Sequence, residues 1–160
     1  MKILGKIVIV IMILFIAYGL YLVTPRLPDN NMVANPNVQS VIIPAIGVNT
    51  PIVNTSINDG VYFEPQSGTP GSGTVILFGH RTTHGKWFYN LDKLTNGDNV
   101  TVNWPGVGKV KYQVLNSTIV PNSYILDPNQ GNKLFLITCT PLGSSAERIL
   151  VECQEVGIDE

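Results

Sequence analysis

The hydrophobic positions of the chain form one long apolar run followed by many short ones. The long run covers residues 7–23, reads IVIVIMILFIAYGLYLV and contains no charged residue. Together with Ile3 and Leu4 it approaches ~20 apolar residues, the length that a helix needs to cross the ~30 Å hydrocarbon core of a bilayer. We therefore predict a single transmembrane helix within residues 1–23.

The flanks of this run predict its orientation. Lys2 and Lys6 precede it, and the positive-inside rule then keeps the N-terminus cytoplasmic and places the rest of the chain outside the cell membrane. A cleavable signal peptide is the alternative, but it would have a shorter apolar region followed by a small-x-small site. Residues 24–28, TPRLP, offer no such site, so we expect an uncleaved anchor, with residues 24–38 as an extended linker rich in Pro and Asn.

Residues 39–160 show short apolar segments between turn residues, which predicts one β domain. The segment 74–78 is apolar throughout, as expected of a strand that is buried on both faces, whereas 99–104 and 109–115 alternate apolar and polar residues. The predicted strands are 41–43, 51–53, 74–78, 99–104, 109–115, 134–137 and 149–151. About seven or eight strands without an internal repeat favour an antiparallel barrel or sandwich.

Two segments of this domain depart from the strand pattern. Phe88, Leu91 and Leu94 are spaced three apart, which predicts a helix over residues 86–94. Residues 122–132, NSYILDPNQGN, are rich in turn formers, so we expect a loop with at most one helical turn.

Composition agrees with a turn-rich β domain and excludes some functions. The chain has 15 glycines and 11 prolines, and 13% of its residues are charged. The formal net charge of -1 argues against a nucleic-acid partner, which would require a basic face. Two cysteines are too few for a disulfide scaffold or a structural zinc site.

Three chemically informative side chains lie at the ends of predicted strands. His80 follows the strand 74–78, Cys139 follows the strand 134–137, and Arg148 precedes the last strand. Acyl transfer through a thioester needs a nucleophilic thiol, an imidazole for proton transfer and a cation for the oxyanion. Each residue alone has an ordinary alternative: a buried thiol, a hydrogen-bonded surface imidazole or a solvated guanidinium.

The second cysteine separates an enzyme from a disulfide-linked module. If residues 133–139 and 148–153 form a hairpin, Cys139 lies near Arg148, and Cys153 lies ~17 Å away at ~3.3 Å per residue. A disulfide requires Cα atoms within ~7 Å of each other. On that register we expect Cys153 to be a free thiol facing the core.

The spacing of His80 and His84 raises the question of a metal site. Two histidines four residues apart can bind a metal on a helix. Here no Glu follows the first His, no third ligand is evident, and the segment follows a strand. We therefore expect neither a metal site nor a cofactor.

Three motifs, in this order along the chain, resemble the sortase family. Residues 136–139, LITC, match the Leu-x-Thr-Cys motif at the end of the seventh sortase strand, and 147–151, ERILV, match the Arg that opens the eighth. Residues 78–80, FGH, match the family's His after an apolar strand, and 88–98 resemble its middle segment. The resemblance extends over residues 40–154.

The resemblance implies an all-β fold, the eight-stranded sortase β-barrel with one or two short helices. It also implies a membrane-anchored cysteine transpeptidase that cleaves an LPXTG-like sorting signal on secreted proteins and joins the acyl part to an amine. Cys139 would be the nucleophile, His80 the general acid and base, and Arg148 the group that stabilises the tetrahedral intermediate. The amine would come from a cell-wall precursor or a protein lysine.

The resemblance also implies a substrate groove. Thr138, Thr140 and His84 are its candidate substrate contacts, and the loop within 119–132 would form much of its wall. Residues 138–143, TCTPLG, resemble pilin-polymerising sortases, but we find neither their Asp-Pro-aromatic lid nor a C-terminal span. We expect only the general activity.

Two other functions stay open from the sequence. The same Cys and His would serve a hydrolytic cysteine peptidase, in which water instead of an amine resolves the thioester. A non-catalytic, membrane-tethered binding module would use neither side chain.

Overall fold

The computed structural model describes residues 38–159. The predicted anchor, and all of the predicted linker except Val38, therefore lie outside the described residues. No helix within residues 38–159 is long and apolar enough to span a bilayer.

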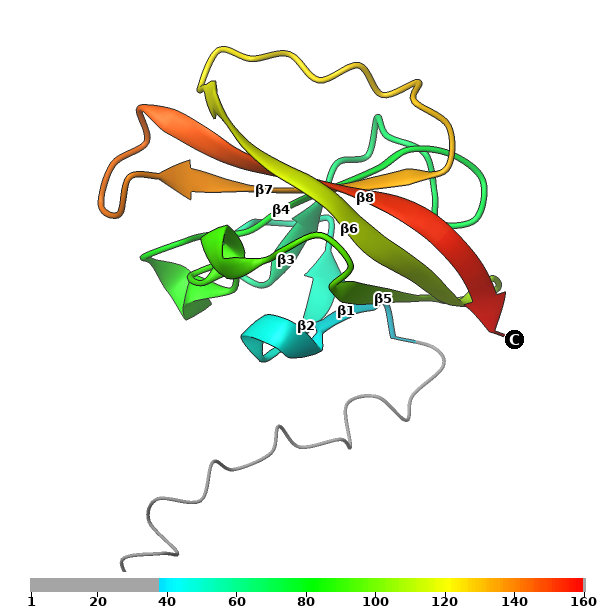
Figure 1. The fold of residues 1–160 in the computed structure, drawn as a ribbon. Coiled ribbons are helices and arrows are strands. Elements are labelled where there is room, and N and C mark those ends of the chain that lie inside the picture. Colours follow the sequence, from blue (N-terminus) through cyan, green and yellow to red (C-terminus); the bar gives the residue numbers. More distant parts are fainter. Residues whose placement is uncertain (1–37, 160) are drawn as a thin grey trace, which may run out of the picture. The chain divides into compact units, whose positions relative to one another are not determined.

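Eight strands close into a barrel, as predicted (Figure 1). The strands are β1 (Ser40–Ile43), β2 (Val48–Val53), β3 (Val61–Phe63), β4 (Val75–Phe78), β5 (Asn99–Trp104), β6 (Gly108–Pro121), β7 (Lys133–Thr140) and β8 (Glu147–Asp159). Their order around the barrel is β1-β2-β3-β4-β7-β8-β6-β5. The pairs β2–β3 and β4–β7 are parallel and the other pairs are antiparallel, so the expected purely antiparallel sheet is wrong and the barrel is mixed.

Strand lengths depart from the sequence prediction in two ways. The short strand β3 was missed, because three residues after a turn carry too little alternation to be recognised. Strands β6 and β8 are much longer than predicted, since they pair with each other from Lys109–Asp159 to Pro121–Glu147. Figure 1 shows them side by side across the barrel. Their exposed polar residues are held in strands by the partner strand rather than by an apolar face.

The predicted helix over residues 86–94 is wrong. The described part of the chain has three short 3₁₀ helices instead: η2 (Pro44–Ile46), η3 (His84–Lys86) and η4 (Leu91–Lys93). A 3₁₀ helix has about three residues per turn, which fits the spacing of three between Phe88, Leu91 and Leu94. All three side chains are buried. The apolar pattern therefore identified the buried residues correctly, but the α-helix inferred from it is wrong.

The barrel interior is a single apolar core. Its largest fully buried side chains are Tyr112, Phe88, Ile43, Leu77, Leu91, Leu134 and Leu136. Strands β5 and β6 contribute alternate residues to it, as the sequence pattern predicted.

A second, smaller apolar cluster lies on the outer face of β4, β7 and β8. Ile76, Phe135, Ile137 and Leu150 form it, and Leu126 from the segment after β6 packs against it. This layer explains why β4 and β7 are apolar on both faces.

Gly79→Ala is expected to destabilise the barrel. A Cβ at Gly79 would lie 2.5 Å from Cδ2 of Phe88, whose ring is fully buried and cannot move aside cheaply. Overpacking of this kind costs about 1–3 kcal/mol, to be measured by urea unfolding. Gly157→Ala is the matched control, because no atom lies within 4 Å of its Cβ position. Equal stability of the two variants would contradict the prediction.

Candidate active site

The strand register brings His80, Cys139 and Arg148 into one row. In the β7–β8 hairpin Cys139 is the partner of Arg148, which confirms the predicted register. In the parallel β4–β7 pair Phe78 is the partner of Ile137. His80 and Cys139 each lie two residues further along, so the same register brings them to one level.

Cys139 and Arg148 lie on the outer face of the barrel wall. Ile137 and Leu150 belong to the outer cluster, and side chains two residues apart along a strand share a face. His80 lies two residues beyond Phe78, just after β4, and all three residues are half-buried. The row therefore forms a rim at the end of the outer apolar layer.

His80 is held by a residue that the sequence did not single out. Its Nε2 lies 2.9 Å from Oδ1 of Asn58, in the segment between β2 and β3. The ring of His84 lies 5.3 Å away between centroids. Partial burial lowers the pKa of His80, and the nearby His84 lowers that pKa further. Asn58 could not be found from spacing, because its segment has neither periodicity nor a motif.

Arg148 extends along the turn between β7 and β8. Its Nη1 donates to the carbonyl oxygens of Ser145 and Glu147, at 2.9 and 3.0 Å. These bonds hold the guanidinium beside the rim. A guanidinium has five N–H donors, so others are available to bind a ligand.

Thr138 and Thr140 lie beneath the rim. Thr138 is buried, and its Oγ1 donates to the carbonyl of Gly79 at 2.7 Å. Thr140 is also buried, and its Oγ1 accepts from Nη1 of Arg81 at 3.0 Å. Both hydroxyls therefore join β7 to the segment that follows β4, whereas His84 is exposed. Contact of these three residues with a substrate stays a prediction.

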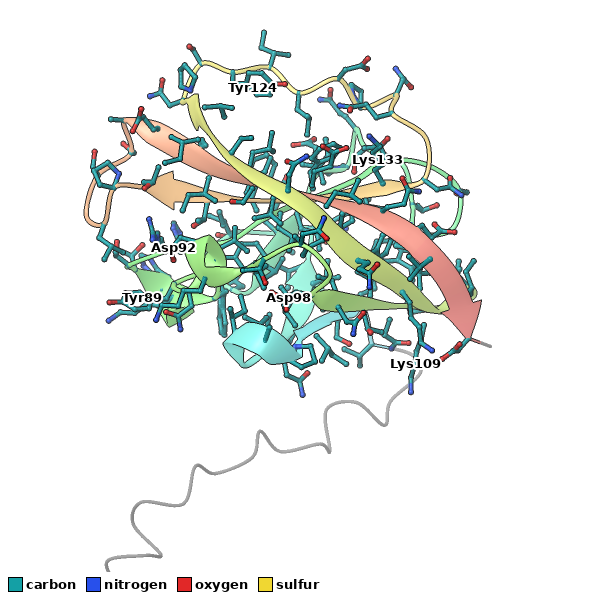
Figure 2. All side chains as sticks on the ribbon, in the orientation of Figure 1. Tyr89, Asp92, Asp98, Lys109, Tyr124 and Lys133 are labelled. Carbon is teal, nitrogen blue, oxygen red and sulfur yellow. The ribbon has the colours of Figure 1, made fainter. Side chains whose placement is uncertain are left out.

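A groove of about 380 Å³ leads to Arg148 along the outer face. Its floor consists of outer-cluster side chains, namely Ile76, Phe78, Ile137 and Leu150. The segment around the end of β6 forms one wall, with Val120, Asn122, Tyr124, Ile125, Leu126 and Pro128, as the sequence predicted for 119–132. Figure 2 shows Tyr124 on this segment. Glu64, Gln66 and Ser67 also line the groove.

The two cysteines have different environments. Both are free, so the disulfide alternative is excluded. Cys153 pairs with Leu134 in the ladder and is fully buried, as predicted. Burial raises the pKa of Cys153 to about 12, with a contribution from the Glu152 carboxylate. Cys153 is therefore a protonated core residue, while Cys139 is partly accessible.

Iodoacetamide at neutral pH is expected to modify Cys139 alone in the folded protein. The thiolate is the reactive form, and Cys153 is both protonated and inaccessible. Peptide mapping should show one carbamidomethyl group in the native state and two after unfolding in urea. Native modification of Cys153 at a similar rate would contradict the assignment of environments.

His84→Asn is expected to raise the pKa of His80. Burial and His84 both lower this pKa, so removing the second imidazole leaves burial alone, and the value moves up toward 6.5. NMR titration of the His80 Hε1 resonance measures the shift. Lys93→Gln is the control and should leave the titration unchanged. An unchanged or lower pKa in His84→Asn would disprove the coupling.

No group of three or more His, Cys, Asp or Glu side chains that could hold a metal is found in residues 38–159.

Comparison with known proteins identifies the family of the barrel. The sortase domain model matches residues 41–156. Sortase SrtE2 of Streptomyces coelicolor is 34% identical over 112 residues, which cover 59% of this chain and only 44% of that protein. Sortase C1 of GBS Pilus Island 1 has a TM-score of 0.68 at 30% identity, over 78% of this chain and 68% of that one.

Sortase A from Corynebacterium diphtheriae has a TM-score of 0.66 at 26% identity, over 78% of this chain and 62% of that one. The family model thus spans most of the barrel, from β1 to β8. The chain belongs to the sortase family.

Proposed function

We propose that this chain is a membrane-anchored cysteine transpeptidase. It cleaves an LPXTG-like sorting signal on secreted proteins and joins the acyl part to an amine. The observation that carries the proposal is the row of His80, Cys139 and Arg148, together with an apolar groove that reaches Arg148. Thiol, imidazole and guanidinium supply the three roles that acyl transfer through a thioester needs.

The first half of the reaction forms the thioacyl enzyme. The Cys139 sulfur attacks the scissile carbonyl carbon, and the resulting oxyanion is stabilised by the Arg148 guanidinium. The C–N bond then breaks, and the imidazolium of His80 gives its proton to the departing amine. Cys139 is left as a thioester and His80 as a neutral imidazole.

The second half resolves the thioester with an amine. The neutral His80 accepts a proton from the incoming amine as its nitrogen attacks the thioester carbonyl. Collapse of the intermediate releases the Cys139 thiolate and leaves a new amide bond. One amide bond is broken and one is formed, so the reaction needs no external energy source.

The groove is suited to an extended peptide with apolar side chains. It runs beside β4 and β7, over Ile76, Phe78 and Ile137, toward the rim. Ile76 and Phe78 are two residues apart on one face, about 7 Å at ~3.3 Å per residue, which matches alternate side chains of a bound extended peptide.

The proposed location follows from residues 1–23. Their apolar run and the preceding lysines support a single-pass anchor with the barrel outside the cell membrane. In that location the barrel meets secreted proteins with C-terminal sorting signals. The acceptor amine would come from a cell-wall precursor or from a protein lysine.

A product assay tests the proposed function. The protein is incubated with a fluorescent LPXTG peptide, with and without a glycyl amine, and the products are separated by mass spectrometry. Transpeptidation predicts a ligated product that increases with amine at the expense of the hydrolysed peptide. Hydrolysis that is insensitive to amine would favour the peptidase instead, and no cleavage of any sorting peptide would favour a binding module.

A further inference from the structure

A buried arginine lies directly beneath the rim. Arg81 follows His80 in sequence and is only 6% exposed. Its Nη1 donates to Oγ1 of Thr140 at 3.0 Å, its Nη2 pairs with Asp92 at 2.8 Å, and its Nε donates to the carbonyl of Tyr89 at 3.3 Å. Tyr89 and Asp92 lie on neighbouring turns of one segment (Figure 2). An unpaired buried charge would cost several kcal/mol, and these three contacts offset that cost for the Arg81 guanidinium.

The network joins the residues that directly follow the imidazole and the thiol. Arg81 is next to His80, and Thr140 is next to Cys139. Cys139 and Thr140 are successive residues of β7, so their side chains point to opposite faces of the strand, and the Arg81–Thr140 bond is buried while His80 and Cys139 are half-buried.

The bond also lies where the regular ladder has ended. The last β4–β7 ladder pair is Phe78–Ile137. Beyond it, the strands are held by two bonds at Gly79, from its N–H to the carbonyl of Ile137 and from Thr138 Oγ1 to its carbonyl. The next cross-link is Arg81 to Thr140. His80 and Cys139 are therefore bracketed by one hydroxyl cross-link before them and one after.

We propose that Arg81, held by Thr140 and Asp92, is a positioning residue that fixes His80 at the distance from Cys139 that proton transfer requires. The kinetic part rests on the proposed function, since it concerns the same thiol and imidazole. Proton transfer needs heavy atoms about 2.6–3.2 Å apart, and a displacement of about 1 Å costs on the order of 10²-fold in rate. Arg81 touches neither sulfur nor substrate and acts through the backbone of its neighbours.

Thr140→Val tests the cross-link with little change of shape. Valine lacks the hydroxyl that accepts from Arg81, so the segment after β4 loses its Arg81 hydrogen bond to β7. We expect kcat to fall roughly 10- to 100-fold while KM changes less than about threefold. Thr140→Ser keeps the hydroxyl and is expected to restore most of kcat.

Thr74→Val is the matched control. Thr74 is 1% exposed, and its Oγ1 also makes a buried cross-link, donating to the carbonyl of Gly131 at 2.8 Å. It lies just before β4, at the opposite end from His80. We expect a loss of stability similar to that of Thr140→Val and an unchanged kcat. An equal loss of kcat in both variants would show that Thr140 only stabilises the fold and would overturn the proposal.

Two measurements separate this proposal from the proposed function. The NMR titration of His80 and the alkylation rate of Cys139 need no sorting peptide. If the imidazole is released, the pKa of His80 should move toward 6.5 in Thr140→Val and stay unchanged in Thr74→Val. Absence of transpeptidation in the natural protein would overturn the proposed function alone. If Thr140→Val has the same His80 pKa, Cys139 alkylation rate and kcat as the natural protein, the positioning role of Arg81 is overturned.

Asp92→Asn is a second test of the network besides Thr140→Val. The Asp92 side chain is 47% exposed, and the amide keeps a hydrogen-bond acceptor for the Arg81 guanidinium while it removes the charge of the ion pair. We expect a smaller fall in kcat in the same direction, with the same shift of the His80 titration. No change in either quantity would count against the network.

Discussion

Cys139→Ala is expected to abolish the thioacyl enzyme and to lower turnover by on the order of 10⁴-fold or more, since loss of a catalytic nucleophile costs this much in related acyl-transfer chemistry. The partly exposed thiol lies in one row with Arg148 and His80, and no other free cysteine of residues 38–159 is accessible. The measurement is intact-mass analysis after incubation with a sorting peptide, together with kcat.

Cys153→Ala is the matched control for this substitution. The Cys153 thiol is fully buried and its pKa is raised to about 12, so it takes no part in the chemistry. We expect full kcat and a stability loss of about 1 kcal/mol from the removed core atom. An acyl adduct that persists in Cys139→Ala, or turnover that depends on Cys153, would refute the assignment of the nucleophile.

Arg148→Met is expected to lower kcat by roughly 10²- to 10³-fold, about 3–4 kcal/mol of transition-state stabilisation. Methionine is long and apolar, so it fills similar space beside the groove without the charge that would meet the oxyanion. The backbone position of residue 148 is set by the β7–β8 pairing, which the substitution leaves intact. Steady-state kinetics with a sorting peptide and an amine measure kcat and KM separately.

Two further variants show whether the loss of kcat in Arg148→Met comes from the missing guanidinium. Arg148→Lys keeps the charge but not the planar guanidinium, so an intermediate kcat is expected. Lys111→Met removes an exposed cation that pairs with Asp159 at 2.6 Å, and such surface pairs contribute at most about 1 kcal/mol to stability. Its kcat should equal that of the natural chain. A wild-type kcat in Arg148→Met would remove Arg148 from the proposed mechanism.

Much of the barrel could be predicted because the apolar and polar residues of its strands alternate according to which side chains are buried. Val110, Tyr112 and Val114 alternate with polar residues, and each is buried in the core. The apolar run 74–78 correctly indicated a strand covered on both faces, although the second cover is an outer layer around Ile137 and not another sheet.

Other features depend on contacts that no local pattern records. The long pairing of β6 with β8 extends strands through exposed polar residues such as Ser117 and Thr118. The run 86–94 buries the expected side chains in 3₁₀ turns, with Gly85 at φ 77 just before it. Asn58 and Arg81 were missed because their partners, His80 and Thr140, lie 22 and 59 residues away in sequence.

By itself the sequence determined the location of most strands, the candidate nucleophile and its two candidate partners, since burial alternates locally and the three motifs are contiguous. Only the tertiary structure decided that His80, Cys139 and Arg148 come to one level, because a row across neighbouring strands depends on register, which is set by pairing between distant segments. It also decided what lies beneath them. Buried polar groups such as Arg81 form hydrogen bonds with residues that are distant in sequence, and the positions of those residues along the chain do not indicate the contact.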